Sequence, residues 1–222
     1  MVGRSGDFAL SEDEVHKLLN SFDNIHEKAI FALATVTGIR RNDLVSIKRR
    51  DFDSNNGIIT FFEHKKGAYH SIRIPSRNTI SMLNEHLASC KASEWLFPSP
   101  RKSREFKNSH ISGRHVFDLF NEHLVLAGLK ERPLHSLRAT CLQLSLAKGW
   151  NFMCGIKLLN IHADTADDNY DRRDCRPTKE DMKNAALDMS FDYDDSMRVA
   201  ENHYNAPSRR EMEEIAEEKP LF

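Results

Sequence analysis

The chain has 222 residues, of which 40% are hydrophobic and 29% are charged, and its formal net charge is −1. This length suits one domain with a sizeable core, and the even mix of charged and apolar residues excludes a disordered chain. It has no apolar run near 18 residues and no charged-then-apolar leader, so we expect no membrane association and an intracellular protein.

The charge is unevenly distributed along the chain. Residues 1–160 carry 23 basic and 16 acidic side chains, a balance of +7, whereas residues 161–222 carry 9 and 17, a balance of −8. A basic body fits a polyanion-binding surface that the acidic end screens, although a solvated acidic helix face explains the same count.

The cysteines are widely spaced and contain no C-x-x-C pair. This spacing predicts neither a disulfide framework nor a zinc site, so we expect reduced thiols in or near the core. The four positions are Cys90, Cys141, Cys154 and Cys175.

The N-terminal part predicts two helices and a turn. Ser11, with Glu14 three residues later, forms a capping-box pattern that indicates a helix start. The apolar segment 29–36 predicts a buried helix that ends at Gly38. Arg40 then falls in the tight turn before the next short helix, where a charge is costly without a purpose.

A β-hairpin is predicted next. The turn residues 55–57 precede two strand-like runs, 58–62 and 68–75, and the tip between the runs presents Lys65 and Lys66. The register of the hairpin decides which lysine faces a binding groove, and we favour Lys65.

Helices account for most of the remainder, so the sequence predicts a mainly α protein with a small antiparallel β-sheet (α+β). Hydrophobic periodicity and turn signals place these helices at about 79–89, 112–126, 136–148, 152–159, 178–189 and 208–217.

His135 and Arg138 lie three residues apart at the start of the segment 136–148. An arginine offers a permanent charge and a planar donor fork suited to phosphate, and a histidine can move a proton near neutral pH. By itself the pair is better explained as a satisfied histidine and a surface arginine. Together with Arg40 and a hairpin lysine, it predicts a phosphate-binding constellation.

The order of these motifs resembles the tyrosine recombinase (phage integrase) family. Thr37-Gly-Ile-Arg40 with Asp43-Leu44 resembles the first arginine box of that family, and Lys65-Lys-Gly67 with Ile74-Pro75 resembles its lysine hairpin. Leu96-Phe-Pro98 and His135-Ser-Leu-Arg138-Ala-Thr140 match its next two boxes. The resemblance covers roughly residues 8–170 and implies the tyrosine-recombinase catalytic fold.

The resemblance implies a site-specific DNA recombinase or integrase. A tyrosine would attack a DNA phosphodiester to form a 3′-phosphotyrosine link, which permits strand cleavage and rejoining without ATP, a cofactor or a metal. Arg40 and Arg138 would bind the phosphoryl oxygens, and Lys65 would protonate the leaving oxygen. His135 would hold the phosphate or accept the tyrosine proton, and His162 would belong to a further Leu-Gly-His box.

The nucleophile is predicted by spacing. Tyr170 stands 32 residues after Arg138, which suits the family, and we favour it over Tyr204, with Tyr193 third. The box before it departs from the family pattern, because the glycine is missing from Leu158-Leu-Asn-Ile-His162 and His162 lies one residue closer to the tyrosine than usual. Tyr204 follows better apolar anchors but would require an insertion of about 34 residues.

The resemblance also implies a domain plan and partners. We expect a catalytic domain over residues 5–208, a C-terminal tail over 209–222 and no N-terminal core-binding domain in this chain. The expected partners are double-stranded DNA and further copies of the chain assembled on paired sites, in the cytoplasm with the nucleoid or in the host cell of a mobile element. A type IB topoisomerase-like enzyme and a non-cleaving DNA-binding relative are the alternative functions.

Overall fold

Residues 5–90, 93–100, 108–162 and 165 are described by the computed structural model of the protein. Helices dominate, and the strands form one antiparallel sheet in the order β1-β2-β3, which confirms the predicted fold class. The elements are η1 (Ser5–Phe8), α1 (Glu12–Asn20), α2 (Ile25–Thr37), α3 (Arg41–Val45), η2 (Arg49–Asp51), β1 (Phe52–Asp53), β2 (Ile58–Glu63), β3 (Ala68–Arg73), α4 (Arg77–Ser89), α5 (Gly113–Leu126), α6 (Ser136–Ala147) and α7 (Phe152–Leu159).

Several predicted features lie outside the described residues. They are the helices at 178–189 and 208–217, the domain boundary at 208, Cys175, and the tyrosines Tyr170, Tyr193 and Tyr204. Among the helices of the described part, none has the length and apolar character needed to cross a membrane.

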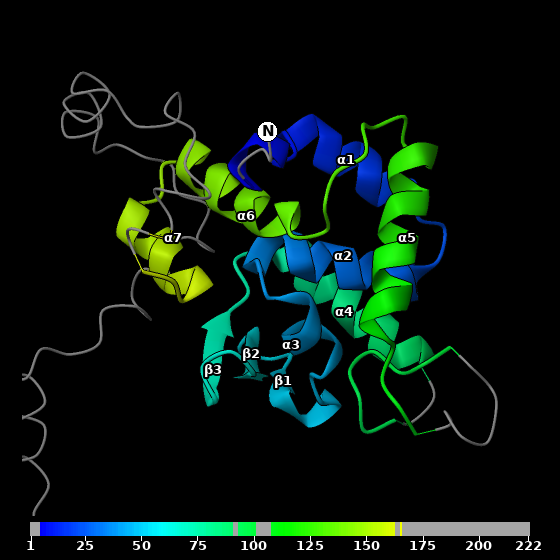
Figure 1. The fold of residues 1–222 in the computed structure, drawn as a ribbon. Helices are drawn as coiled ribbons and strands as arrows, with labels where there is room; N and C mark the ends of the chain where they lie inside the picture. Colours follow the sequence, from blue (N-terminus) through cyan, green and yellow to red (C-terminus); the bar gives the residue numbers. More distant parts are fainter. Residues whose placement is uncertain (1–4, 91–92, 101–107, 163–164, 166–222) are drawn as a thin grey trace, which may run out of the picture.

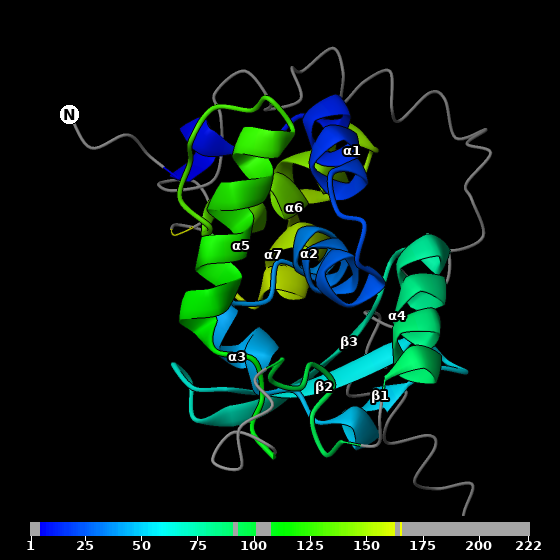
Figure 2. The ribbon, with the colours of Figure 1, turned by 90° about the vertical axis from the view of Figure 1, so that its right-hand side faces the viewer.

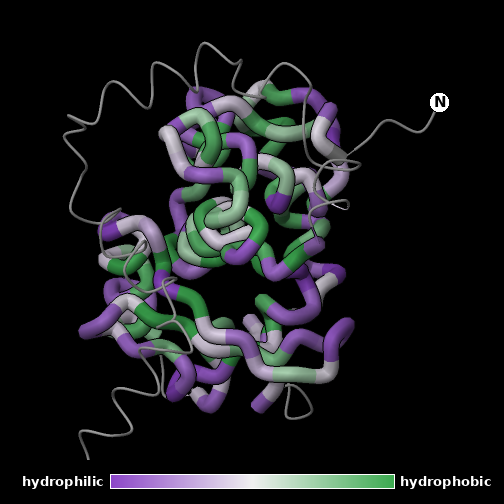
Figure 3. The backbone as a smooth tube through the Cα atoms, turned by 90° about the vertical axis from the view of Figure 1, so that its left-hand side faces the viewer, coloured by the Kyte–Doolittle hydropathy of each residue, from purple (hydrophilic) through white to green (hydrophobic). Residues whose placement is uncertain are grey.

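Helix α2 forms the centre of the core. Helices α1, α4 and α6 pack against it, and α5 contributes Phe120, whose ring stacks on Phe31 at 5.9 Å between centroids (Figures 1 and 2). Every residue of α2 from Ala29 to Thr35 is buried, as expected for a helix that is hydrophobic on all sides. Figure 3 shows hydrophobic segments toward the middle of the molecule and hydrophilic ones on its outer loops.

Local sequence signals set the helix ends. Ser11 and Glu14 form the predicted capping box at the start of α1, and α2 ends at Gly38 in the left-handed conformation with φ 60°. Glycine is required there for a second reason, because a β carbon on Gly38 would collide with the side chain of Leu159.

The sheet holds the predicted hairpin and one further strand. Strands β2 and β3 pair in antiparallel register from Ile58 opposite Arg73 to Glu63 opposite Ala68. Strand β1 adds only two residues to the other edge of β2, and a run this short has no periodicity that a sequence pattern can detect. Figure 2 shows the sheet along one end of the molecule, with the hairpin reaching beneath α3.

The N-terminal segment is fixed to α6, and the residues that meet are 130 positions apart in the sequence. The backbone N–H of Leu10 donates to the Thr140 hydroxyl at 2.8 Å, and the guanidinium of the buried Arg132 pairs with Glu14 at 2.9 Å. Helix α6 packs beside α2, and the first turn of α6 lies near the C-terminal end of α2, where Arg138 donates to the Gly38 carbonyl.

Candidate active site

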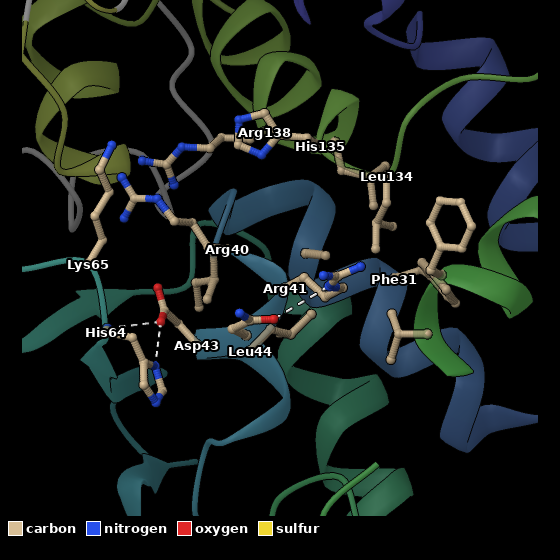
Figure 4. Close-up of a pocket in the computed structure, with 16 residues that line it drawn as sticks. Phe31, Arg40, Arg41, Asp43, Leu44, His64, Lys65, Leu134, His135 and Arg138 are labelled. Atoms are coloured by element: carbon tan, nitrogen blue, oxygen red, sulfur yellow. Dashed lines mark hydrogen bonds and ion pairs between the residues drawn. The ribbon is translucent and has the colours of Figure 1, made fainter. Parts of the chain in front are cut away.

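A pocket of about 410 Å³ lies where the end of α2, the start of α3, the hairpin tip and the start of α6 meet. Four predicted site residues line it, namely Arg40, Lys65, His135 and Arg138. Figure 4 shows the side chains of Arg40, Lys65 and Arg138 extending toward one another from three different elements. The fold therefore gathers the predicted phosphate-binding residues, which are spread over almost 100 positions of sequence.

Arg40 is held by a buried carboxylate. It is the N-cap residue of α3, and its Nη1 donates to Oε1 of Glu63 at 2.5 Å. The Glu63 side chain is 3% exposed and that of Arg40 is 22% exposed. A buried carboxylate requires a compensating partner, and Arg40 supplies it through one edge of its guanidinium. Glu63 thereby fixes that edge, and Arg40 still lines the pocket.

Glu63 also joins the hairpin to the end of α7. Its second oxygen, Oε2, accepts a hydrogen bond from the side-chain amide of Asn160. Asn160 in turn accepts from the Lys66 ammonium through both its side-chain and backbone oxygens, each at 2.6 Å. We call this chain of contacts from Arg40 through Glu63 to Asn160 the Glu63–Asn160 bridge.

Arg138 lies deeper than Arg40. Its residue is 4% exposed, and its guanidinium donates to the carbonyl of Gly38 at 2.6 Å and to the carbonyl of Leu159. Arg138 thereby ties α6 to the ends of both α2 and α7. A buried guanidinium held by two backbone carbonyls keeps its charge and a fixed orientation at the pocket wall.

The two hairpin lysines point to different partners. Lys65 lines the pocket with the arginines, whereas the Lys66 ammonium is bound to Asn160. The geometry therefore favours Lys65 as the lysine available to a ligand in the pocket.

His135 is the N-cap residue of α6 and lines the same pocket. His135 is exposed as a residue, but desolvation of its ring lowers the pKa of His135. The positive charges of Arg138, Arg40 and Lys65 lower this pKa further. The ring is therefore neutral near pH 7 and has a nitrogen lone pair that can accept a proton.

Asp43 and His64 also line the pocket, although they were not among the predicted site residues. Oδ1 of the buried Asp43 lies 2.8 Å from His64 Nδ1 and accepts from the His64 backbone N–H at 3.1 Å (Figure 4). Asp43 thus anchors the hairpin tip to α3, next to Lys65. In the sequence, the signal for Asp43 was its position three residues after Arg40.

His162 is not brought into the pocket with the other predicted residues. It is exposed, and the residues that line the pocket do not include it. The proposed nucleophiles Tyr170 and Tyr204 lie outside the described residues, so their positions relative to the pocket stay predictions.

The sequence as a whole matches one family model. The model of the phage integrase family aligns with residues 9–166, which include every pocket residue described above. The chain belongs to the phage integrase family.

Named relatives agree with this assignment. The tyrosine recombinase XerA of Pyrococcus furiosus is 27% identical over 181 residues, which are 81% of this chain and 62% of the relative, so the chain spans less than two thirds of that protein. A crystal structure of XerA recombinase superposes with a TM-score of 0.63 at 20% identity, over 83% of this chain and 66% of the other. The crystal structure of a lambda integrase tetramer bound to a Holliday junction superposes with a TM-score of 0.55 at 24% identity, over 71% of this chain and 46% of the integrase chain. At these identities the two structures establish the fold.

The integrase Leu-Gly-His box is altered in this chain, and the structure explains how the backbone tolerates the change. Asn160, the C-cap residue of α7, adopts the left-handed conformation with φ 49°. Asparagine is the residue that most readily replaces glycine in this conformation. Unlike glycine, Asn160 has a side chain, and that side chain makes the Glu63–Asn160 bridge.

The Leu96-Phe-Pro98 box contributes packing. Leu96 and Phe97 are fully buried core residues, and the backbone N–H of Leu96 donates to the Ile47 carbonyl at 2.9 Å.

Glu63 was missed by the sequence prediction although a signal was present. It continues the inward alternation of Ile59 and Phe61 along β2, and an acidic residue at an inward position indicates a buried partner.

Proposed function

We propose that the chain is the catalytic part of a site-specific DNA recombinase that breaks and rejoins strands through a 3′-phosphotyrosine intermediate. The observation that supports this proposal most directly is the convergence of Arg40, Lys65, His135 and Arg138 on one pocket. Such a set of donors and cations suits a phosphodiester whose charge grows as a fifth oxygen approaches phosphorus.

Each pocket residue has a role in the proposed reaction. The tyrosine oxygen forms a bond to phosphorus as the bond from phosphorus to the 5′ oxygen breaks. The neutral ring of His135 accepts the tyrosine proton, and the Lys65 ammonium gives a proton to the departing 5′ oxygen. Arg40 and Arg138 stabilise the non-bridging oxygens. A phosphodiester remains at each stage, so the step reverses without ATP, and a metal has no required part.

Double-stranded DNA and further copies of the chain are the proposed partners. The described part carries the pocket on the basic portion of the sequence, residues 1–160 with their balance of +7, and such a charge attracts a DNA backbone. The tetrameric assembly of the similar lambda integrase on a Holliday junction supports assembly on paired sites.

A nicked suicide substrate tests the proposal. Cleavage next to the nick releases a short oligonucleotide, so the covalent protein–DNA adduct cannot reverse and is counted on a denaturing gel. We expect an adduct with the 3′ end of the cleaved strand. DNA binding without an adduct would support the non-cleaving alternative, and relaxation of supercoiled DNA without sequence-specific junctions would support the topoisomerase-like one.

Replacing Lys65 by alanine should slow cleavage by about 10²–10⁴-fold, because the leaving 5′ oxygen loses its general acid. A substrate with sulfur in place of that oxygen should restore most of the rate, since a thiolate leaves without protonation. Single-turnover cleavage of the two substrates measures the difference. Lys66→Ala is the matched control, and it should affect both substrates equally and to a smaller extent. Sulfur rescue of Lys66→Ala, with none for Lys65→Ala, would assign the acid to Lys66.

Replacing Asn160 by glycine should slow cleavage roughly tenfold, because Glu63 loses the amide that helps it position Arg40. Glycine accepts the left-handed backbone of this position, so the substitution removes the side chain without straining the chain. The substitution removes two hydrogen bonds to charged groups, an exposed one from Lys66 and a part-buried one to Glu63. Loss of the bond to Glu63 should lower the free energy of unfolding by about 1.5–3 kcal/mol.

Single-turnover cleavage rates and urea unfolding measure the two effects of Asn160→Gly. Asn55→Gly, in the exposed turn before β2, is the control for adding a glycine, and it should cleave at the parental rate. A parental rate for Asn160→Gly would show that Arg40 keeps its position without the bridge.

A further inference from the structure

A second cluster of chemically reactive side chains lies between α2 and α4. His26 is in the first turn of α2, and His86 and Cys90 lie four residues apart at the C-terminal end of α4. One ligand-type atom from each residue, a ring nitrogen or the sulfur, lies within 4.8 Å of the others. The two Nδ1 atoms are 2.8 Å apart. The sequence did not reveal this cluster, because His26 is 60 positions from His86.

The hydrogen bonds of His86 orient it as a metal ligand. Its Nε2 lies 2.7 Å from the Leu96 carbonyl, and a carbonyl only accepts, so Nε2 carries the hydrogen and Nδ1 presents its lone pair toward His26. Histidine ligands in metal sites usually donate their second nitrogen to a carbonyl or carboxylate in this way. Burial also lowers the pKa of His86, which keeps the ring neutral near pH 7.

The electrostatics of the cluster include favourable and opposing contributions. Cys90 is the C-cap residue of α4, where the partial negative charge of the helix end favours a cation. Burial raises the pKa of the Cys90 thiol, and the charge of Arg49 offsets only part of that rise. Arg49, which donates to the Leu87 carbonyl at 3.2 Å, also repels a bound cation. Two neutral imidazoles and one thiolate leave a divalent ion with one uncompensated charge.

We infer that His26, His86 and Cys90 bind one Zn²⁺ ion, with water as the fourth ligand. Nitrogen and sulfur ligands select zinc over magnesium or calcium. Bonds of about 2.0–2.3 Å hold tetrahedral ligand atoms about 3.4–3.6 Å apart. The two ring nitrogens therefore separate by about half an ångström on binding. His26 moves its hydrogen from Nδ1 to Nε2 by exchange with solvent, so its ring stays neutral, and the thiol proton of Cys90 passes to solvent.

The ion has a structural role in this assignment. The cluster is at the N-terminal end of α2 and the candidate active site is at its C-terminal end, so the length of the helix, roughly 18 Å, separates them. Zinc would join α2 to α4, two helices that pack directly against each other, and would stabilise the folded state by binding only to it.

Titration of the full, tag-free, chelator-treated chain with Co²⁺ tests the site. Cobalt replaces zinc in such sites, and a bound thiolate gives a charge-transfer absorption in the near ultraviolet. We expect one equivalent to produce this band, Zn²⁺ to abolish it by displacement, and Zn²⁺ to raise the thermal unfolding midpoint.

Three variants separate this site from other thiols. The band should be absent in Cys90→Ser, and in His26→Ala the apparent Kd should rise at least about tenfold. The absorption band should be unchanged in Cys154→Ser, which removes a cysteine of α7 that lies outside the cluster. Circular dichroism verifies that each variant is folded. No band at one equivalent of Co²⁺, a band that persists in Cys90→Ser, or an unchanged Kd in His26→Ala would overturn the assignment.

Discussion

Replacing Tyr170 by phenylalanine should abolish the covalent adduct on a nicked suicide substrate. Phenylalanine has the same ring but no oxygen, so no phosphotyrosine bond can form while the remaining contacts to DNA persist. The expected effect is complete because a nucleophile has no partial substitute in this reaction. Denaturing gel electrophoresis after incubation with end-labelled DNA measures the adduct, and a filter-binding assay confirms that the variant still binds DNA.

The other tyrosines provide the controls for Tyr170→Phe. Tyr204→Phe and Tyr193→Phe should form the adduct, as should Tyr69→Phe, which alters an exposed residue of β3. An adduct that survives in Tyr170→Phe and disappears in Tyr204→Phe would move the nucleophile to Tyr204. Tyr170 would then lie in an insertion between Arg138 and the nucleophile.

Replacing Arg138 by alanine should reduce cleavage by about 10²–10³-fold, because one positioned donor to the phosphoryl oxygens is lost. The same change should destabilise the fold. The carbonyls of Gly38 and Leu159 lose their buried donor, and each unsatisfied buried group costs about 1–3 kcal/mol. Arg138→Lys keeps the charge, but a single ammonium lacks the guanidinium fork that reaches both carbonyls, so much of the loss should remain.

Arg132→Ala separates the two effects of Arg138→Ala. Arg132 is also buried, donates to the carbonyls of Phe8 and Ala9, and pairs with Glu14, but it does not line the pocket. The Arg132→Ala variant should lose about as much stability as Arg138→Ala, and its cleavage rate per folded molecule should be unchanged. Urea unfolding gives the folded fraction by which each rate is corrected. Equal corrected rates for the two variants would assign Arg138 a purely structural role.

Asn160 illustrates how a departure from a family motif can be read only in part from sequence. The missing glycine of the Leu-Gly-His box is a departure from the family pattern that the sequence shows. In the structure Asn160 occupies the left-handed position that glycine would take, and its side chain bonds to Glu63. The backbone requirement is local and follows from residue type, whereas the partner of the amide depends on how α7 packs beside the hairpin.

The sequence by itself determined the features that depend on near neighbours along the chain. The capping box at Ser11, the end of α2 at Gly38, the hairpin and the limits of α7 follow from hydrogen bonds and apolar periodicity within a few residues. The order of the motifs also predicted Arg40, His135 and Arg138 as one group, and the structure places all three at the same pocket.

Only the tertiary structure decided which side chains meet. It separated Lys65 from Lys66, gave Arg40 its partner Glu63, and brought His26 beside His86. Two adjacent lysines at a hairpin tip are the same residue type, so the sequence alone does not distinguish their partners. The contacting residues Arg40 and Glu63 are 23 positions apart and His26 and His86 are 60 apart, so local periodicity does not reveal either contact. Such pairings depend on the packing of α2 against α4 and α6 and of the hairpin against α7, and they form because buried charges and polar atoms require partners once that packing excludes water.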